Sequence, residues 1–513
     1  MNRTSNVLKP AIAWISISML IPLLTTGCSF AANLGKSESG MAQQQTEAKP
    51  EISMMLVLNS ADPPRDTIVK PLEDKTGTKL SFTWVPDNIY TDKMVSAIAG
   101  GTLPKVLQIK SVDLKHPSVV NGIRSGMFWE IGPLLKDYPH ISKYMNATIM
   151  NNGSYFGKYY GLYWERPLSR QGIQYRKDWL ERLGLKEPHT IEELYTVLQA
   201  FTYGDPDGNG KQDTYGLLDR NDLVYGAFKN IASYFGTPNN WGFVNKRLVP
   251  DFMTVEYLET MRFMKKLYDE KLINPDFTVT SKVQQEDRFI NGEAGMMISN
   301  VLAATIRDRI KKSNPAAVIE IQNRISGPKG DRIWGSTGIG GLFLFPKTSV
   351  KTEAELRAVL SFFDQTLTED VNNLITYGLQ DRHYKLINEK TIKIMPETKT
   401  LREQEVELYA NALRTADIRY LQLGENGSFQ EKINAMIQDN NNIVVLDPTA
   451  ALISQAQAEK GTELQTIITD ATYQFILGKL DEAGFNRELG KWRQNGGNLI
   501  MEEMNREYEE FNK

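Results

Sequence analysis

The segment from Tyr203 to Gly216, which reads YGDPDGNGKQDTYG, carries oxygen-bearing side chains at the spacing of a calcium-binding loop. Counted from Asp205, such side chains stand at positions 1, 3, 5 and 9, and Gly210 stands at position 6, where these loops turn sharply. Calcium prefers six to eight oxygen ligands, and this spacing wraps a short chain around the ion. The sequence therefore predicts a structural Ca²⁺ site formed by the side chains of Asp205, Asp207, Asn209 and Asp213 and, at position 7, by the backbone carbonyl of Lys211.

The loop departs from an EF-hand at position 12, where Gly216 replaces the bidentate glutamate. The remaining ligands would then come from Thr214, from water or from a distant carboxylate. A surface turn rich in Asp, Asn and Gly is the alternative interpretation. Because the sequence contains only one such loop, we expect the site to stabilise the fold and not to act as a calcium sensor.

Two predicted helices lead into this loop. The pattern YRKDWLERL predicts a helix over Tyr175–Leu183 that ends at Gly184. Thr190-Ile-Glu-Glu193 has the pattern of a capping box and predicts a helix that continues to about Phe201. The second helix would therefore fix the position of the loop.

An alternation of strands and helices is predicted near the start of the globular part. Strands are expected over 52–58, 79–85 and 106–109, with helices over 68–76 and 91–99 between them. This order predicts an α/β fold with a parallel sheet, in which ligands bind at the carboxyl ends of the strands. Asn59, Ser60 and Lys110 are expected at that edge.

Size and charge limit the class of protein. The 513 residues suffice for two lobes with separate cores, and 59 basic against 62 acidic residues argue against a nucleic-acid-binding surface. The four histidines include no H-E-x-x-H pair, and G-x-S-x-G, P-loop and Rossmann motifs are absent from the sequence.

Residues 1–28 resemble a bacterial lipoprotein signal. Arg3 and Lys9 precede an uncharged, mostly apolar stretch, and small residues then precede Cys28, the only cysteine. We expect Cys28 to be the lipidated first residue of the mature chain, carrying palmitate or a related acyl group; a retained membrane helix is the alternative. Residues 29–50 contain almost no large apolar side chains and are predicted to be a flexible tether.

The series formed by Tyr175–Gly184, Thr190–Leu194 and the Asp205–Asp213 loop resembles the family 1 extracellular solute-binding lipoproteins of bacterial ABC importers, especially the branch that binds oligosaccharides. Lys75–Gly77, Gly101–Pro104 and Phe289–Met296 match as well, and the resemblance covers nearly all of residues 50–510. The stretch Tyr377–Tyr384 resembles the family's Gly-x-Glu-Gly-x-His-Tyr element, with Gln380 and Asp381 replacing the Glu and the second Gly.

The resemblance implies a two-lobed α/β fold of the periplasmic-binding-protein type, with a hinged cleft that closes on a solute. The lobes would comprise residues 51–164 with about 301–375, and residues 165–300 with about 376–513. The implied protein is a monomer anchored by lipid to the outer face of a bacterial cell membrane. It binds structural Ca²⁺, captures a carbohydrate and delivers it to the membrane subunits of an ABC permease.

A sugar offers apolar ring faces and many hydroxyl groups, so its site combines aromatic planes with polar donors and acceptors. Tyr163, Trp164, Trp241 and Trp334 stand in segments expected at the crossings or loops, and Arg166 has the geometry to bind a carboxylate or a pair of hydroxyls. Trp84 is a weaker candidate, and Trp179 is expected in a helix core. For each tryptophan, a purely structural role in the core is the alternative.

An enzyme is the second functional hypothesis. A glycoside hydrolase needs two carboxyl groups on either side of the scissile bond, and Glu130, Glu165 and Glu293 lie near the segments predicted to line the cleft. Acidic residues are abundant on protein surfaces, so we favour a binding protein without catalytic activity.

Overall fold

The computed structural model describes residues 49–301, 304–424 and 428–511. The predicted signal segment with Cys28, and all but the last two residues of the predicted tether, lie outside these ranges. Within the described part of the chain, no helix is both long enough and apolar enough to cross a membrane.

The first sheet has five strands in the order β2-β1-β3-β14-β4. Its strand β1 pairs in parallel with β2 and β3, which confirms the predicted parallel sheet, and β14 pairs antiparallel with β3 and β4. The strands are β1 (Glu51–Leu58), β2 (Lys79–Pro86), β3 (Val106–Lys110), β4 (Gly161–Glu165) and β14 (Ile339–Leu344).

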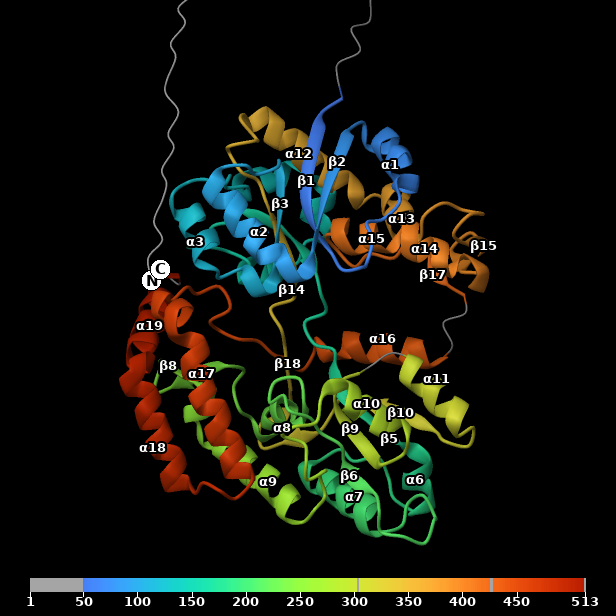
Figure 1. Cartoon of the computed structure of the whole chain (residues 1–513), viewed down its shortest axis with the longest axis vertical. Coiled ribbons are helices and arrows are strands. Elements are labelled where there is room, and N and C mark those ends of the chain that lie inside the picture. Colours follow the sequence, from blue (N-terminus) through green and yellow to red (C-terminus); the bar gives the residue numbers. More distant parts are fainter. Residues whose placement is uncertain (1–48, 302–303, 425–427, 512–513) are drawn as a thin grey trace, which may run out of the picture. The chain divides into compact units, whose positions relative to one another are not determined.

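Helices cover both faces of the first sheet (Figure 1). Alternate residues of β1 enter two different cores: Ile52, Met54 and Leu56 enter one, and Met55 and Val57 enter the other. This explains why β1 is a nearly continuous apolar run. The helices are α1 (Val69–Thr76), α2 (Asp87–Gly100), α3 (Pro117–Arg124), α4 (Pro139–Tyr144), α5 (Ala147–Asn152), α12 (Glu353–Thr366), α13 (Glu369–Tyr377), α14 (Lys399–Glu405) and α15 (Glu407–Leu413).

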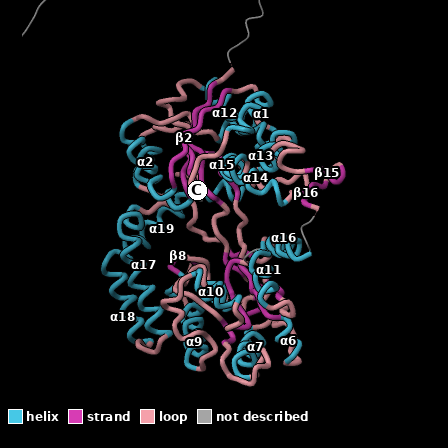
Figure 2. The backbone as a smooth tube through the Cα atoms, turned by 45° about the vertical axis from the view of Figure 1, so that its right-hand side comes forward, coloured by secondary structure: helices cyan, strands magenta, loops and turns pink. Residues whose placement is uncertain are grey.

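The second sheet has four strands in the order β10-β5-β9-β6. Figure 2 shows its strands as a group separate from those of the first sheet. The strands are β5 (Gln171–Arg176), β6 (Tyr215–Leu217), β9 (Ala294–Asn300) and β10 (Ile319–Gln322). The helices of this part are α6 (Lys177–Arg182), α7 (Ile191–Tyr203), α8 (Ala227–Phe235), α9 (Val255–Asp269), α10 (Lys282–Ile290), α11 (Ala304–Ser313), α16 (Ser428–Asn440), α17 (Gln455–Ile476), α18 (Glu482–Trp492) and α19 (Asn498–Phe511).

Small sheets join segments that are distant in sequence. The pair β13 (Ile333–Trp334) and β18 (Val444–Val445) is parallel and places Trp334 beside Val445. The other small sheets are the hairpin β7 (Trp241–Val244) with β8 (Arg247–Pro250), the pair β11 (Ser326–Gly327) with β12 (Gly330–Asp331), and β15 (Lys385–Asn388), β16 (Thr391–Lys393) and β17 (Gln422–Leu423).

The hydrophobic cores show which segments fold together. Val406, Tyr409 and Leu413 pack into a core of the first sheet, contrary to the prediction that residues from about 376 to 513 belong to the second lobe. Ile319 and Ile321 pack with Phe289 and Met297 beside the second sheet, contrary to the prediction that residues from about 301 to 375 belong to the first lobe. The chain passes between the two sheets after β4, after β10 and after β17.

Two local predictions are wrong in detail. The helix expected over Tyr175–Leu183 begins at Lys177, because Tyr175 and Arg176 continue the edge pairing of β5 with β10. The capping box at Thr190 is only half present: its hydroxyl accepts the N–H of Glu193 at 3.2 Å, but the Glu193 carboxylate accepts the N–H of His189 at 2.7 Å.

Candidate functional site

A cavity near the second sheet has a volume of about 560 Å³ and is called here the large cavity. Its walls come from α8, the turn before β7, the start of α9, and α17, with Lys115 from the first-sheet part and Trp334 and Asp447 from the paired β13 and β18 segments. Aromatic rings dominate its apolar surface: Phe228, Trp241, Phe252, Tyr257, Trp334, Tyr473 and Trp492. The cavity therefore offers flat apolar surfaces of the kind that pack on sugar rings.

The turn Asn239–Trp241 positions polar groups beside these rings. The Asn239 amide donates to the carbonyls of Gly335 at 2.6 Å and Val445 at 2.9 Å, which ties the turn to β13 and β18. Asn240 has a positive φ of 59° and donates from its side chain to Asp447 at 2.8 Å. Asn tolerates this left-handed conformation better than most residues, so the Asn-Asn-Trp sequence suits the turn.

Trp334 lies at the wall of the large cavity with an unused donor. Tyr225 meets its ring edge-on at 5.6 Å, and the Lys229 ammonium lies 4.8 Å from the ring centroid. Among the described residues, its buried Nε1 has no hydrogen-bond partner, and neither has the buried hydroxyl of Thr237 in the same wall. Buried polar groups without partners are costly, so a ligand hydroxyl or carboxylate would satisfy them.

Charged groups of both signs face the large cavity. Lys115 donates to the carbonyl of Thr449 at 3.2 Å. Burial lowers the pKa of both Lys115 and Lys229, and the nearby Asp447 acts on both in the opposite direction. Burial also raises the pKa of Asp251 to about 7, against the influence of Lys229.

Two smaller cavities share wall residues with the large cavity or with each other. The middle cavity, of about 230 Å³, shares Lys115 and Asp447 with it. The sheet-edge cavity, of about 370 Å³, shares Ser111 and Val112 with the middle cavity. The three cavities therefore adjoin one another through shared walls, and this row of cavities ends at the carboxyl edge of the first sheet, where open α/β sheets bind ligands.

The sheet-edge cavity brings together four residues proposed from the sequence: Asn59, Lys110, Trp164 and Arg166. Asn59 and Arg166 follow strands β1 and β4, Lys110 ends β3, and Trp164 is the penultimate residue of β4. The Trp164 ring lies against two glycines of β14, where an added Cβ would stand 2.0 Å from it at Gly340 and 1.9 Å at Gly341. These glycines therefore make room for the indole, which lines the cavity beside the Arg166 guanidinium.

Trp241 and Trp334 line the large cavity, whereas two other proposed residues line none of these three. Tyr163 alternates with Trp164 along β4, so it points to the opposite face of the sheet, where it is fully buried and its hydroxyl accepts the N–H of Asn146. Ser60 is exposed, and its hydroxyl donates to the carbonyl of Asp62.

The other tryptophans named from the sequence are in cores. Trp179 is buried and meets Phe201 edge-on, as predicted, and Trp84 packs against Phe82 and Tyr409 beside the first sheet. In the Tyr377–Tyr384 stretch, His383 is buried and paired with Glu405 at 3.0 Å.

Several cavity residues were missed by sequence reasoning. Lys115 and Lys229 belong to no motif, and Tyr473, Trp492 and Asp447 lie in a C-terminal region read only as helical. The Asn-Asn pair beside Trp241 and the Gly-Ser-Thr-Gly segment after Trp334 are the signals that pointed to this wall. The rest of the wall depends on how distant segments pack.

The Asp205–Asp213 loop gathers its carboxylates around Asn209. Asn209 donates from its amide to Asp207 at 2.8 Å and to Asp213 at 3.1 Å, while its backbone N–H donates to Asp205 at 3.0 Å. No cluster of three or more His, Cys, Asp or Glu residues arranged for a metal is found within residues 49–301, 304–424 and 428–511. The donor chemistry, four side chains with hard oxygens converging in one turn, nevertheless suits a calcium ion.

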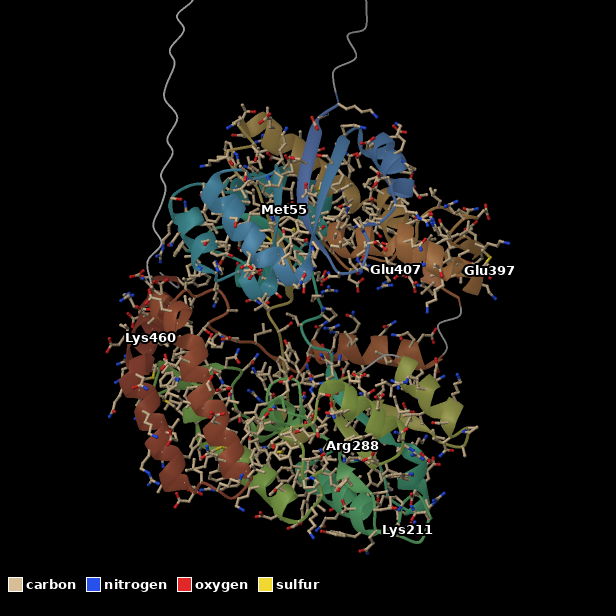
Figure 3. All side chains as sticks on the ribbon, viewed as in Figure 1. Met55, Lys211, Arg288, Glu397, Glu407 and Lys460 are labelled. Atoms are coloured by element: carbon tan, nitrogen blue, oxygen red, sulfur yellow. The ribbon has the colours of Figure 1, made fainter. Side chains whose placement is uncertain are left out.

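The structure shows the environment of two residues next to the loop, Thr214 and Gly216. The Thr214 hydroxyl donates to the carbonyl of Phe201 at 2.8 Å, so it is engaged by the end of α7. At Gly216, an added Cβ would stand 2.4 Å from the carbonyl oxygen of Leu198, which leaves no room for the glutamate of an EF-hand. Lys211 lies on this loop, beyond α7 (Figure 3).

The carboxylates considered for hydrolysis have other partners. Glu130 pairs with Lys158 at 2.9 Å, and Glu293 pairs with Arg288 at 2.7 Å. Glu165 accepts the N–H of Asp417 at 3.2 Å, and burial raises its pKa. None of these three lines the row of cavities.

Comparison with known proteins identifies the family. The model of the bacterial extracellular solute-binding proteins matches residues 61–364. The polygalacturonan/rhamnogalacturonan-binding protein YtcQ of Bacillus subtilis is 44% identical over 95% of this chain and 97% of its own length. Lipoprotein LipO of the same organism is 34% identical over 97% of this chain and 98% of its own length.

Solved structures agree on the fold. A solute-binding protein of Bifidobacterium longum infantis, described as an HMO-binding component associated with an ABC transporter, superposes with a TM-score of 0.69 at 16% identity. The match covers 91% of this chain and all of that one. The fold is therefore the two-lobed α/β fold of periplasmic binding proteins, and the chain belongs to the bacterial extracellular solute-binding protein family.

Proposed function

We propose that this protein captures an oligosaccharide and delivers it to an ABC permease. The observation that carries the proposal is the row of three cavities that share walls, with Trp241 and Trp334 in the large cavity and Trp164 in the sheet-edge cavity. A single sugar unit would fill only part of such a row. The polygalacturonan/rhamnogalacturonan-binding relative supports a polymeric carbohydrate as the source of the ligand.

We define the bounds of the two lobes by the hydrophobic cores into which their residues pack. We assign residues 51–165 and 339–424 to the first lobe, and residues 171–325 and 428–511 to the second. The segments between them would act as the hinge. Closure requires contacts that the ligand makes only when both lobes reach it.

Cys28 is proposed as the lipid anchor, and the mature protein is proposed to act as a monomer at the outer face of the cell membrane. The lipoprotein signal pattern and the similarity to lipoprotein LipO support this assignment. Substitution of Cys28 by Ser should release the protein from the membrane fraction of the expressing bacterium. Retention in that fraction would contradict the lipid anchor.

Calcium is proposed as a structural ion bound by the side chains of Asp205, Asp207, Asn209 and Asp213 and the carbonyl of Lys211. The convergence of these side chains in one turn supports this. The ion would tie the end of α7 to the start of β6, since the loop connects these two elements.

Capture without chemical conversion is the proposed outcome of binding. The family consists of binding proteins, and the three glutamates considered for hydrolysis do not meet along the cavities. A thermal-shift screen of mono- and oligosaccharides, with each mixture then analysed for cleavage products, tests the proposal. A ligand that stabilises the protein and remains intact supports it, whereas released products would favour the hydrolase alternative.

A further inference from the structure

The row of cavities contains cationic side chains that have no carboxylate partner. Lys229 faces the large cavity, Lys115 faces the large and middle cavities, and Arg166 faces the sheet-edge cavity. Within the described residues, no carboxylate oxygen lies within 4.0 Å of these three cationic groups. Lys110 differs, because it pairs with Asp87 at 3.1 Å.

The carboxylates in the same walls are already engaged. Asp447 accepts from the N–H of Thr449 at 2.8 Å and its hydroxyl at 2.7 Å, and from the Asn240 amide at 2.8 Å. Asp222 accepts the N–H groups of Val224 and Tyr225 at 3.0 and 2.9 Å. Asp447 and Asp222 are therefore committed to holding the walls together. Lys115 and Lys229 donate only to neutral acceptors, the carbonyl of Thr449 at 3.2 Å and the side-chain oxygen of Asn240 at 2.5 Å.

Burial acts on each of these cations in the same direction. It lowers the pKa of Lys115, of Lys229 and of Arg166, and for Arg166 the nearby Arg170 and Arg414 act in the same sense. Nearby carboxylates act in the opposite direction, Asp447 on Lys115, Asp251 and Asp447 on Lys229, and Asp417 on Arg166, but burial has the larger effect on the pKa of each. A partly desolvated cation without a carboxylate in direct contact is costly, and an anion from the ligand would reduce that cost. Charge complementarity of this kind contributes to specificity and to the rate of association.

We propose that the ligand is an acidic oligosaccharide whose uronic-acid carboxylates are read by Lys229, Lys115 and Arg166. Trp241 and Trp164 then provide apolar surfaces for its rings near the two ends of the row. The cations come from both proposed lobes, so successive carboxylates would hold the lobes together. This inference rests on the proposed function and specifies the class of sugar.

Binding of unesterified trigalacturonate and of its fully methyl-esterified, uncharged form tests this inference. We expect the ester to bind at least about tenfold more weakly, in line with the loss of one charge-assisted hydrogen bond. Lys115→Met and Lys229→Met should each reduce the preference for the acid over the ester by about tenfold. Lys136→Met, at an exposed site away from the cavities, is the matched control and should not change this preference. Thermal melting of each variant checks that it is folded.

The outcomes separate the inference from the function on which it rests. Equal affinity for acid and ester, or an unaltered preference in both lysine variants, overturns the acidic ligand but leaves oligosaccharide capture intact. Tighter binding of a neutral oligosaccharide such as xylotriose than of trigalacturonate would also overturn the acidic ligand and leave oligosaccharide capture intact. If no acidic or neutral oligosaccharide binds at all, the proposed function itself fails.

Discussion

Trp241 is both a core residue and a candidate contact for the ligand. It belongs to the second-sheet core and lines the large cavity. Trp241→Ala should weaken oligosaccharide binding by about tenfold, because the ligand loses an aromatic surface. Trp241→Leu keeps more of the buried volume and should show the same loss with a smaller fall in stability.

Trp179 supplies the matched control for that experiment, because it is buried in the same core and does not line the large cavity. Trp179→Leu should lower the melting temperature and leave the affinity of the folded protein unchanged. Isothermal titration calorimetry with the ligand found in the screen measures both variants. Unchanged affinity in both Trp241 variants would remove this residue from the site.

Asp219 is a buried carboxyl whose titration should be visible in stability. Burial raises its pKa to about 7 from an ordinary value of 3.8, and its Oδ1 accepts the N–H of Ala227 at 2.9 Å. Between pH 4 and 7 the folded state therefore binds more protons at Asp219 than the unfolded state does. Its contribution to stability is then greatest at low pH and falls as the pH rises through this window.

Asp219→Asn keeps an acceptor for Ala227 and removes the titration. We expect the variant to gain on the order of 2 kcal/mol relative to the parent between pH 5 and pH 8 in urea unfolding. Asp470→Asn, at an exposed position of α17, is the control and should show no such relative gain. A pH-independent difference between Asp219→Asn and the parent would contradict the raised pKa.

Single residues also show how far the sequence could be read. Asn59 and Lys110 could be placed at the carboxyl edge because they follow or end strands of a recognisable sheet, whereas Trp164 and Arg166 were proposed from their side-chain chemistry. Tyr163 failed because strand alternation reverses the direction of adjacent side chains, and the register of β4 was not known in advance. The position of Lys229 in the site could not be predicted, because a lysine on a helix is ordinarily solvated. Only its position over the Trp334 ring in the structure distinguishes it.

At the scale of elements, Gly216 shows why the calcium loop departs from an EF-hand. An added Cβ would meet the backbone of Leu198 in α7 at 2.4 Å, and backbone cannot move aside as a flexible side chain can. Gly216→Ala should therefore destabilise the protein by about 1–3 kcal/mol, the usual cost of overpacking. Gly490→Ala, in α18 with nothing within 4 Å of the added Cβ, should be neutral or stabilising by up to about 1 kcal/mol.

Both glycine substitutions can be measured by urea unfolding of the same protein preparation. A neutral Gly216→Ala variant would show that α7 and β6 are less closely held than the structure indicates. Equal destabilisation in both variants would point to a general effect of replacing glycine and not to the contact with Leu198.

Removal of calcium should loosen the same pair of elements. An ion bound only by the folded state adds stability by mass action, so EGTA should lower the melting temperature by several degrees. Added Ca²⁺ should restore it, whereas Mg²⁺ should not, because Mg²⁺ demands a tighter octahedral arrangement. Asp207→Asn should reduce the response to calcium. An unchanged melting temperature in EGTA would contradict the structural ion.

Elements were predicted best where their signal is local. The strands and helices from residue 51 to 110 follow apolar runs and helix-ending glycines, and the structure confirms their order. The pairing of β13 with β18 joins Ile333 to Val444 and was not predicted, because two-residue strands carry no period and their partners lie far apart in sequence. That pairing is what brings Trp334 and Asp447 to the large cavity.

At the scale of the whole molecule, the proposed function requires the two lobes to respond to the ligand. Lys115 of the first lobe donates to the carbonyl of Thr449, in the segment that follows β18, and both residues line the large cavity. A ligand that contacts both sides favours the closed arrangement by the free energy of the contacts present only there.

Small-angle X-ray scattering of the mature protein should therefore show a radius of gyration that falls by on the order of 1 Å from roughly 23 Å when the ligand saturates the site. Trp241→Leu at ligand concentrations too low to saturate it should remain in the unliganded form, and raising the concentration should recover the contraction. A radius that stays constant while titration calorimetry shows saturation would contradict closure and favour a preformed site.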